Sequence, residues 1–474
     1  MQKYKIYAGG EFCDTKNSLM VYKPFDNKVI AETYLAGNDE LEKAIRKAEL
    51  VKSELRDLPS HKRYSILMDI ANKISSKKNE LALILANEAG KPFKYALGEI
   101  NRAIQVFIIA AEESKRLPKE YLSIDWTEAG ENKEGFVKYF PIGLIAGIAP
   151  FNFPLNLAAH KIAPAIASGN AIIIKPARST PLSVLELAKI IDTTELPKGA
   201  FSVLPMDREA GNQLVTDDRF NMLSFTGSPN VGWKMKANAG KKKVALELGG
   251  NAGVIVSNQS DIDLAVNKCL VGGFAYSGQV CIHVQRIVVQ EKVFDQFVDK
   301  FITATKKLKF GAPDDQSTDI SVMIDEENAI RVEEWVGEAV KDGAEILFGG
   351  KRNGAYFEPT IITNTHREMK VCALEIFGPV VTIEKYSEFK QAVDIINDSE
   401  YGLQAGVFTD NIKEINQSFN EIEVGGVIIN DVPTFRVDHM PYGGVKNSGF
   451  GREGVKYAIL EMMEPRLLVK NTDY

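Results

Sequence analysis

Cys281 is the residue whose type and position best suit covalent chemistry. It lies in the motif SGQVCI, residues 277–282, between a predicted helical segment and a predicted strand. Gly278 allows close backbone approach, and a thiol presented at the end of a segment is in the setting where a thiolate becomes a nucleophile. Most cysteines instead act as small buried apolar residues, and we interpret Cys13, Cys269 and Cys372 in this way.

Glu247 and Asn152 are candidates for the base and the hydrogen-bond donor that such a nucleophile needs. Glu247 ends an apolar strand-like run and precedes two glycines. Burial there would raise the pKa of the carboxyl and make it a usable base near neutral pH. Asn152 lies on an irregular loop between two prolines, where its amide could bind an oxygen that becomes negative during a reaction. A salt-bridged glutamate and a turn asparagine are the alternative interpretations.

Two further motifs follow predicted strands and could bind a phosphate. Residues 174–178 (IKPAR) end a strand with Lys175 and Arg178, and residues 225–228 (FTGS) end a strand and open a helix. In an open α/β sheet, ligands bind beyond the carboxyl ends of the strands, and a helix N-terminus offers backbone N–H groups to an anion. A surface charge pair is the alternative for the two cations.

Composition limits the class of protein. The chain has 474 residues, 45% hydrophobic and 25% charged, which predicts two or three ordinary globular domains rather than a disordered chain. A formal net charge of −6 provides no general basic field, so nucleic acid is a poor candidate partner. Four cysteines without a CxxC pair predict a reducing compartment and no thiolate metal site. No secretory signal is recognised, and prolines with His160 and Lys161 interrupt the most apolar stretch, residues 142–174, so we expect a cytoplasmic protein without membrane contact.

The elements that must position these side chains alternate along the chain. Short strands and turns come first, and helices are predicted from Asp39, which has capping-box spacing to Glu42, and over residues 61–89 and 95–116. Apolar runs then predict strands at residues 144–148, 171–174, 201–204, 222–225, 244–246 and 254–256, and later at 286–289, 344–348, 380–385 and 427–429. Strands that alternate with helices indicate parallel strands covered on both faces, which is a doubly wound α/β fold. Residues 119–139 predict strands outside the main core, and the strand-like tail within residues 457–470 could pair with them or with another subunit.

Seven motifs, in this order, resemble the aldehyde dehydrogenase superfamily over nearly the whole chain: PFNFP, KPAR, FTGS, ELGG, GQVC, EIFGP and PYGGVKNSG. The 34-residue offset between Glu247 and Cys281 agrees with it. The chain looks most like the branch of lactaldehyde, succinate-semialdehyde and non-phosphorylating glyceraldehyde-phosphate enzymes. The resemblance implies a Rossmann-like cofactor-binding domain (residues 1–118 and 140–247), a second α/β catalytic domain (248–440) and a small β oligomerisation arm (119–139 and 455–474).

The resemblance also implies a role for each motif residue. Cys281 would attack the aldehyde carbon, Asn152 and the Cys281 backbone N–H would hold the oxyanion, and Glu247 would activate the water that hydrolyses the thioester left by hydride transfer to NAD or NADP. Lys175 would hold the adenosine ribose, Ser228 the pyrophosphate and Glu375 the nicotinamide ribose. Further cofactor positions would be Pro150, Phe151, Thr226, Gly227, Leu248, Gly249 and Phe377. No metal is expected.

Cofactor preference and substrate depend on cationic residues. Arg178 occupies the position where many NAD-preferring members place a glutamate, so NADP should be accepted, unless Arg178 turns into solvent and discriminates nothing. Arg436 suits an aldehyde that carries a carboxylate, phosphate or sulfonate, although it could instead form a structural ion pair with Asp438 or Asp431. In this family the loop that contains Arg436 lines the substrate tunnel, and other regions of that tunnel match Arg102, His160 and His283. His283 could form a hydrogen bond with a 2-hydroxyl group of the substrate or be an ordinary polar residue.

The predicted function is NAD(P)-dependent oxidation of a short hydroxy- or anionic aldehyde to its acid by a homodimer or homotetramer. A CoA-acylating semialdehyde dehydrogenase is one alternative, but that chemistry does not need the water-activating base that Glu247 offers. A catalytically silent ligand-binding protein on the same fold is the other. The intact candidates Cys281, Glu247 and Asn152 argue against it.

Overall fold

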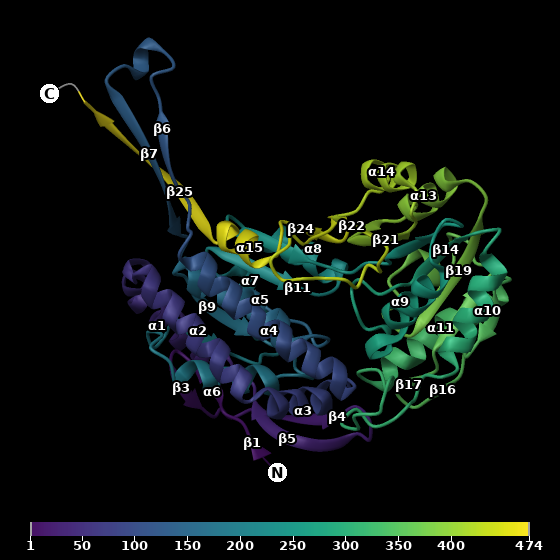
Figure 1. The fold of residues 1–474 in the computed structure, drawn as a ribbon. Helices are drawn as coiled ribbons and strands as arrows, with labels where there is room; N and C mark the ends of the chain where they lie inside the picture. Colours follow the sequence, from purple (N-terminus) through teal and green to yellow (C-terminus); the bar gives the residue numbers. More distant parts are fainter. Residues whose placement is uncertain (1, 473–474) are drawn as a thin grey trace.

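Two large β-sheets form the body of the protein, and a long arm projects from it (Figure 1). The computed structural model describes residues 2–472. One large sheet comes mainly from the first half of the chain, purple to teal in Figure 1, and the other from the second half. This arrangement confirms the predicted α/β class.

The first sheet has eight strands in the order β24-β12-β11-β8-β9-β10-β2-β3. Five neighbouring strands, β12 to β10 in this order, are parallel, and each strand outside them pairs antiparallel with its neighbour. Parallel neighbours bring the carboxyl ends of β9, β8, β11 and β12 to one edge, where four of the predicted motifs begin. The bounds are Gly449–Phe450 (β24), Lys243–Glu247 (β12), Met222–Thr226 (β11), Leu144–Ile148 (β8), Ala171–Lys175 (β9), Phe201–Val203 (β10), Ile6–Ala8 (β2) and Glu11–Cys13 (β3).

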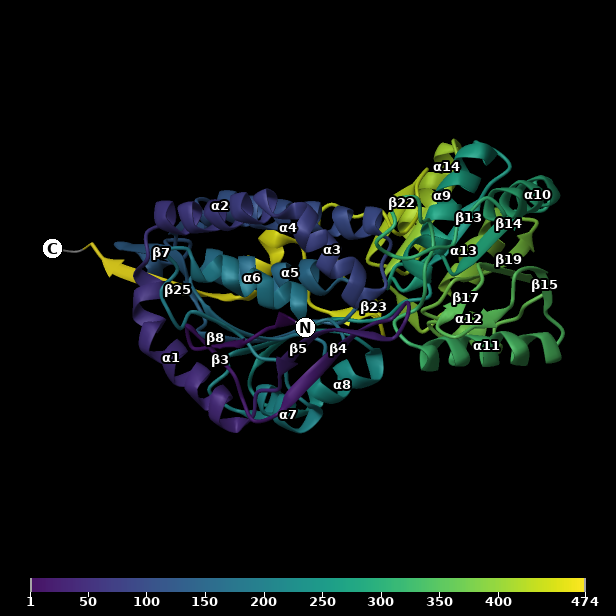
Figure 2. The same cartoon turned by 90° about the horizontal axis from the view of Figure 1, so that it is seen from below.

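Helices cover both faces of this sheet, as the doubly wound prediction requires. Figure 2 shows α2 to α6 on one face and α1, α7 and α8 on the other. Every residue of α5 is buried, which explains the apolar stretch that contains it. Within residues 2–472, no helix is long and apolar enough to cross a membrane. The bounds are Asn38–Asp57 (α1), Ser60–Ser76 (α2), Lys78–Ala89 (α3), Phe93–Ser114 (α4), Pro154–Ser168 (α5), Leu182–Asp192 (α6), Arg208–Thr216 (α7) and Pro229–Asn238 (α8).

The second sheet has seven strands in the order β15-β18-β19-β14-β13-β21-β22, all parallel except β15. Strand β13, which the sequence pattern placed in the first series, lies inside this second sheet, between β14 and β21. The bounds are Glu345–Phe348 (β15), Thr360–Thr363 (β18), Val380–Tyr386 (β19), Arg286–Gln290 (β14), Gly253–Val256 (β13), Gln404–Phe408 (β21) and Gly426–Ile429 (β22). Its helices are Ile262–Phe274 (α9), Phe294–Thr305 (α10), Glu326–Lys341 (α11), Lys370–Ala373 (α12), Phe389–Asn397 (α13) and Ile412–Glu421 (α14).

Two strands of the second sheet, β18 and β21, were not predicted from the sequence. Strand β18 has only four residues, and β21 contains Gln404 and Gly406, which weaken the apolar strand pattern. Short strands complete the list: Gln2–Lys3 (β1), Ser18–Lys23 (β4) and Lys28–Tyr34 (β5) form a small sheet, and Arg352–Asn353 (β16), Tyr356–Phe357 (β17), Tyr401–Gly402 (β20) and Val445–Lys446 (β23) form two pairs.

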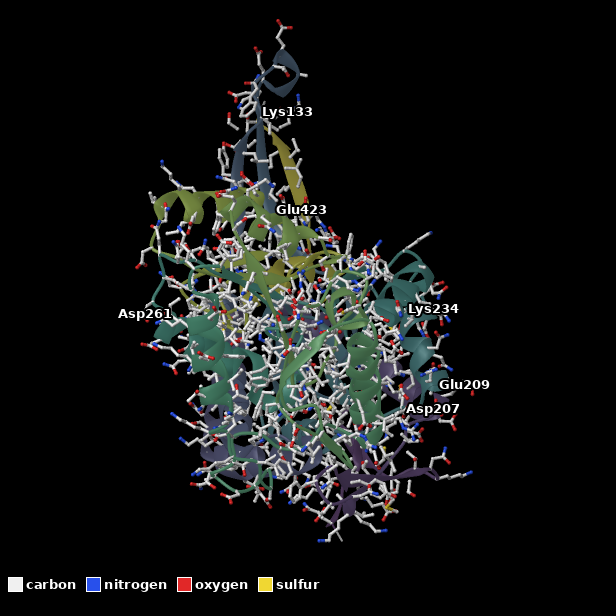
Figure 3. The ribbon with its side chains drawn as sticks, turned by 90° about the vertical axis from the view of Figure 1, so that its right-hand side faces the viewer. Lys133, Asp207, Glu209, Lys234, Asp261 and Glu423 are labelled. Carbon is white, nitrogen blue, oxygen red and sulfur yellow. The ribbon has the colours of Figure 1, made fainter. Side chains whose placement is uncertain are left out.

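The arm is a three-stranded antiparallel sheet in the order β25-β7-β6, with bounds Met463–Asn471 (β25), Lys133–Pro141 (β7) and Lys119–Ser123 (β6). The C-terminal strand β25 therefore pairs with the hairpin formed by β6 and β7. This was one of the two alternatives predicted for the tail. Figure 3 places Lys133 near the outer end of the arm. Helix α15 (Val455–Glu461) packs against α4 and α5, so the start of the predicted 455–474 segment belongs to the body, and residues 473–474 lie outside the described residues.

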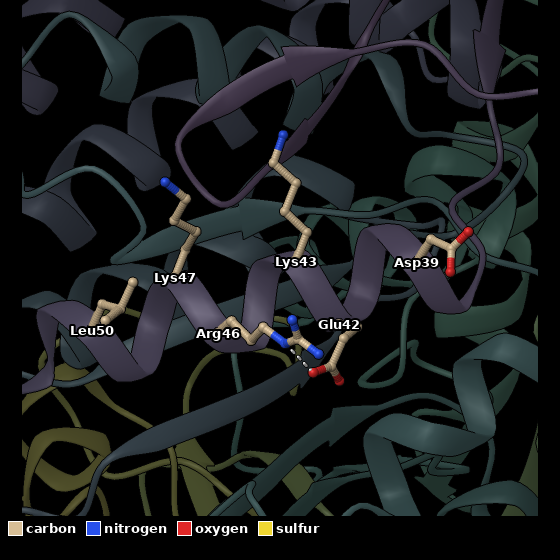
Figure 4. Close-up of a pocket in the computed structure, with 6 residues that line it drawn as sticks. All are labelled: Asp39, Glu42, Lys43, Arg46, Lys47 and Leu50. Carbon is tan, nitrogen blue, oxygen red and sulfur yellow. Dashed lines mark hydrogen bonds and ion pairs between the residues drawn. The ribbon is translucent and has the colours of Figure 1, made fainter.

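Two predictions about the early helices were wrong in detail. Helix α1 begins one residue before Asp39, and the Glu40 carboxylate accepts from the Gly37 backbone N–H at 2.8 Å, so only the glutamate half of a capping box forms, two residues earlier than predicted. Glu42 instead accepts from Arg46 Nε at 2.6 Å, within a hollow on the outer face of α1 (Figure 4). The predicted helix over residues 61–89 is two helices, α2 and α3, separated at Lys77.

Candidate active site

Cys281 lies on a tightly constrained turn between the two sheets. The turn begins with a short 3₁₀ segment, Ala275–Gly278 (η2), in which Tyr276, Ser277 and Gly278 have φ angles of 51°, 52° and 67°. A Cβ at Gly278 would lie 2.1 Å from the Gly378 carbonyl oxygen, so only glycine fits there. The turn presents a half-buried thiol, as predicted for a nucleophile.

Among residues 2–472, the Cys281 sulfur has one polar side-chain partner. Its Sγ lies 3.4 Å from the hydroxyl oxygen of Tyr442. Burial raises the pKa of the Cys281 thiol to about 11, and the Tyr442 hydroxyl opposes this shift. The resting thiol is therefore protonated at neutral pH and must lose its proton before it attacks. Tyr442 belongs to the PYGG motif, but its contact with the cysteine was not predicted, because the two residues are 161 positions apart.

The structure brings Asn152 to the cysteine turn. The side chain is buried, and Nδ2 donates to the backbone oxygen of Gln279, two residues before Cys281, at 3.0 Å. An amide has two N–H donors, so one remains for a ligand. The Asn152 backbone oxygen accepts from Lys91 Nζ at 2.6 Å.

Lys91 is an unpredicted part of this arrangement. Its fully buried ammonium pairs with Glu99 and lies 3.8 Å and 4.4 Å from the ring centroids of Phe153 and Tyr276. Glu99 also accepts from the first backbone N–H groups of α5. From sequence, Lys91 and Glu99 resemble ordinary charges at a helix start, because nothing local shows that both are buried.

Glu247 ends β12 and lies beside Thr226 and Gly449 in the sheet register. Its carboxyl is buried, and Oε2 has no hydrogen-bond partner among the described residues. Burial, reinforced by the charge of Glu453, raises the pKa of Glu247 well above its usual range. A Cβ at Gly443 would lie 3.1 Å from Glu247 Oε1, and Gly443 follows Tyr442. Glu247 therefore lies near the tyrosine that contacts Cys281, with the properties predicted for a base.

The predicted cofactor residues gather at the carboxyl edge of the first sheet. Pro150 and Phe151 follow β8, Lys175 and Arg178 follow β9, Thr226, Gly227 and Ser228 follow β11, and Leu248 and Gly249 follow β12. Ser228 is exposed at the N-terminus of α8, and burial lowers the pKa of Lys175. Arg178 is exposed and forms no ion pair with any residue in the described range 2–472. Such an edge fits a dinucleotide.

Glu375 and Phe377 reach this edge from the second half of the chain. Glu375 Oε1 accepts from the Gly250 N–H at 3.1 Å, and a Cβ at Gly249 would lie 2.2 Å from Glu375 Oε2. Burial raises the pKa of Glu375 to about 7. Phe377 meets Phe151 edge to face, with ring centroids 5.8 Å apart. Gly249 and Gly250 thus leave room for the Glu375 carboxylate beside the strand ends. This position fits the predicted role of Glu375, which is to hold the nicotinamide ribose.

Arg436 has a different partner from the two that the sequence suggested. Its guanidinium pairs with Glu453 at 3.1 Å and lies 3.6 Å from the Tyr442 ring centroid, while Asp431 pairs with Lys268. Glu453 also pairs with Lys161, whose Nζ donates to Thr226 Oγ1 at 2.8 Å. No role was predicted for Lys161 or Glu453, because the two residues lie 292 positions apart in the chain.

Asp438 binds two of the other predicted substrate residues. The same Oδ1 lies 2.5 Å from Arg102 Nη2 and 2.8 Å from His160 Nε2. His283 does not join them. It is buried, its Nε2 lies 2.8 Å from the Gly273 backbone oxygen, and burial lowers its pKa to about 4. That hydrogen bond occupies Nε2 only, and Nδ1 has no partner among the described residues, so the role of His283 toward a substrate hydroxyl stays a prediction.

Comparison with known proteins agrees with this geometry. The sequence matches the aldehyde dehydrogenase family over residues 12–468. The chain belongs to the aldehyde dehydrogenase family. It is 44% identical over 473 residues to a 3-sulfolactaldehyde dehydrogenase of Priestia aryabhattai, covering 99% of this chain and 98% of the relative.

Two solved structures have the same fold. Aldehyde dehydrogenase 21 of Physcomitrella patens, in complex with the reaction product succinate, has a TM-score of 0.98 and 43% identity over 100% of this chain and 99% of its own. Glyceraldehyde-3-phosphate dehydrogenase GapN of Methanocaldococcus jannaschii, complexed with NADP, has a TM-score of 0.93 and 42% identity over 96% of this chain and 100% of its own. The protein is thus an NAD(P)-dependent aldehyde dehydrogenase. Among residues 2–472, no group of three or more His, Cys, Asp or Glu side chains could hold a metal ion.

Proposed function

We propose that Cys281, Asn152 and Glu247 together oxidise a short anionic aldehyde to its carboxylic acid. The Cys281 thiolate attacks the aldehyde carbon and forms a tetrahedral thiohemiacetal. The free N–H of Asn152 Nδ2 and the Cys281 backbone N–H stabilise its oxyanion. Bound NAD or NADP supplies the hydride acceptor for this step. Glu247 then takes a proton from the water that attacks the resulting thioester, which releases the acid and the thiol.

The cofactor site follows from the strand ends. Lys175 and Ser228 would hold the adenosine ribose and the pyrophosphate, and Glu375 would hold the nicotinamide ribose against Phe377. The exposed, unpaired Arg178 is free to accept a 2′-phosphate, because a cation there attracts the group that a glutamate would repel. We infer that NADP is accepted alongside NAD.

The substrate proposal depends on one observation, the charge balance of the residues around Arg436. Lys161, Arg436 and Arg102 contribute three cations, and Asp438 and Glu453 contribute two carboxylates. These five groups together carry one excess positive charge, which favours a substrate with one anionic group. The relative that acts on 3-sulfolactaldehyde and the structure that holds succinate support this class.

We also propose how the protein assembles, what each large sheet does and where the protein is located. The arm exposes apolar residues along β25 and the hairpin: Leu467, Leu468, Val469, Tyr121, Phe136 and Trp126. We infer that a second copy covers this surface in a homodimer or homotetramer. The first sheet would bind the cofactor and the second would supply the nucleophile. Four free cysteines suit the reducing cytoplasm.

The experiment is a turnover panel with NAD and with NADP. It compares lactaldehyde and glycolaldehyde with succinate semialdehyde, glyceraldehyde 3-phosphate and sulfolactaldehyde, and measures the acid formed without CoA. We expect higher kcat/KM for the anionic aldehydes. Equal rates for neutral and anionic aldehydes would refute the substrate class, and a requirement for CoA would refute hydrolysis of the thioester by water.

A further inference from the structure

Three buried polar atoms without hydrogen-bond partners among the described residues belong to one cluster: Glu247 Oε2, His160 Nδ1 and Arg436 Nε. Buried polar atoms are nearly always paired, so unpaired ones in a substrate site point to a ligand. Glu247 already has a role as base, and Arg436 suits an anion. His160 Nδ1 has no role in the chemistry above.

His160 is linked to the reacting groups through a series of contacts. It precedes Lys161 on α5, and Lys161 and Arg436 both pair with Glu453. Arg436 in turn lies over the ring of Tyr442, whose hydroxyl contacts Cys281. The charge of Arg436 acts on His160 directly, lowering its pKa in addition to the larger effect of burial. His160 is therefore a neutral imidazole in the same buried cluster as Arg436 and Glu453.

Asp438 determines which nitrogen of His160 carries the proton. Burial alone would raise the pKa of Asp438, but the hydrogen bonds from His160 and Arg102 hold it below its usual range, so the group is a carboxylate. A carboxylate only accepts hydrogen bonds, so the His160 nitrogen that faces it, Nε2 at 2.8 Å, must be the donor. In a neutral imidazole the other nitrogen, Nδ1, is then an acceptor.

We propose that His160 Nδ1 accepts a hydrogen bond from the hydroxyl group next to the aldehyde carbon, and that Asp438 is the positioning residue that fixes this tautomer. The inference rests on the proposed function and narrows its substrate class to short 2-hydroxyaldehydes that carry an anionic group. An aldehyde without the hydroxyl leaves the buried acceptor unpaired, which should lower kcat/KM by about 10- to 100-fold.

The kinetic test uses pairs of aldehydes that differ only in this hydroxyl: lactaldehyde with propanal, and glycolaldehyde with acetaldehyde. We expect the wild-type enzyme to prefer the hydroxylated member of each pair. In His160→Phe the ratio should fall toward one, and His160→Gln, whose amide oxygen is an acceptor, should recover part of it. His283→Gln is the matched control and should keep the wild-type ratio. A preference that is absent, or that follows His283, would overturn the proposal.

A second measurement reads the tautomer without turnover. The enzyme is labelled with ¹⁵N-histidine, and the His160 signals in the NMR spectrum are assigned by their loss in His160→Gln. They should show that Nε2 is protonated and Nδ1 is not. Asp438→Asn can donate its amide N–H to Nε2, so the proton should move to Nδ1 and the kinetic preference should collapse. A protonated Nδ1 in the wild-type enzyme would refute the proposal. If the anionic aldehydes are oxidised but the hydroxyl has no effect, this inference fails and the proposed function stands.

Discussion

Lys91 Nζ donates a hydrogen bond of 2.6 Å to the backbone oxygen of Asn152, the proposed oxyanion donor. The same ammonium pairs with Glu99, which accepts from the backbone of the helix that follows Asn152. Asn152 is thus fixed on one side by a buried ion pair and on the other by Gln279 in the nucleophile's turn. A donor fixed before the reaction needs little reorganisation when charge develops, which is the main source of oxyanion stabilisation.

Removal of this ammonium should loosen the oxyanion donor. In Lys91→Met we expect kcat to fall by about 100-fold, because a small displacement of a positioned group has effects of that size. The free energy of unfolding should fall by about 3–5 kcal/mol, because Glu99 remains buried and unpaired. The control Lys91→Met/Glu99→Gln removes the unpaired charge, so it should recover stability but not kcat. Recovery of wild-type kcat in the double variant would contradict the positioning role.

Arg178 should set the preference between the two nicotinamide cofactors. In Arg178→Glu, kcat/KM with NADP should fall by about tenfold or more, about 1.4 kcal/mol, since a carboxylate would repel the 2′-phosphate. Activity with NAD should be kept or improved. Arg56→Glu is a control at an exposed arginine on α1, where neither cofactor should respond. An unchanged NADP to NAD ratio in Arg178→Glu would show that Arg178 discriminates nothing.

The reactivity of the nucleophile should rise with pH. Because the pKa of Cys281 is raised to about 11, the thiolate fraction grows about tenfold for each pH unit below that value. Inactivation of the free enzyme by iodoacetamide should follow this slope between about pH 7 and pH 9. Tyr442→Phe removes the hydrogen bond that lowers the pKa of the thiol, so its inactivation should be slower at each pH. A rate that does not change with pH would contradict a protonated resting thiol.

The apolar surface of the arm should hold the subunits together. Leu467 and Val469 are 52% and 47% exposed on β25, so Leu467→Lys/Val469→Lys places charges on that surface. We expect light scattering after size-exclusion chromatography to show a shift to monomer. Leu50→Lys, at a side chain 78% exposed on α1, should leave the assembly intact. A wild-type protein that is already monomeric would refute the role of the arm.

Local patterns predicted the strands and motif residues well, because strand periodicity and strand-end glycines act over short distances. Lys175, Thr226 and Glu247 lie at one sheet edge, since parallel strands align their carboxyl ends. The pairings that span the chain could not be predicted. Lys91 with Asn152, His160 with Asp438, and Lys161 with Glu453 join segments that only the tertiary fold brings together. His283 is close to Cys281 in sequence, but its Nε2 contacts the Gly273 backbone oxygen rather than a residue of the substrate cluster.

The most direct measurement of the three-residue chemistry is to trap the thioester. Glu247→Gln keeps the nucleophile and the oxyanion donor but lacks the base, so hydride transfer should proceed and hydrolysis should stall. Rapid mixing with succinate semialdehyde and NADP should give a burst of reduced cofactor near one equivalent per subunit. Mass spectrometry of the acid-quenched enzyme should locate the acyl group on Cys281, and Cys281→Ala should give neither signal. Equal slowing of both steps without an acyl adduct, or an adduct on another cysteine, would contradict the mechanism.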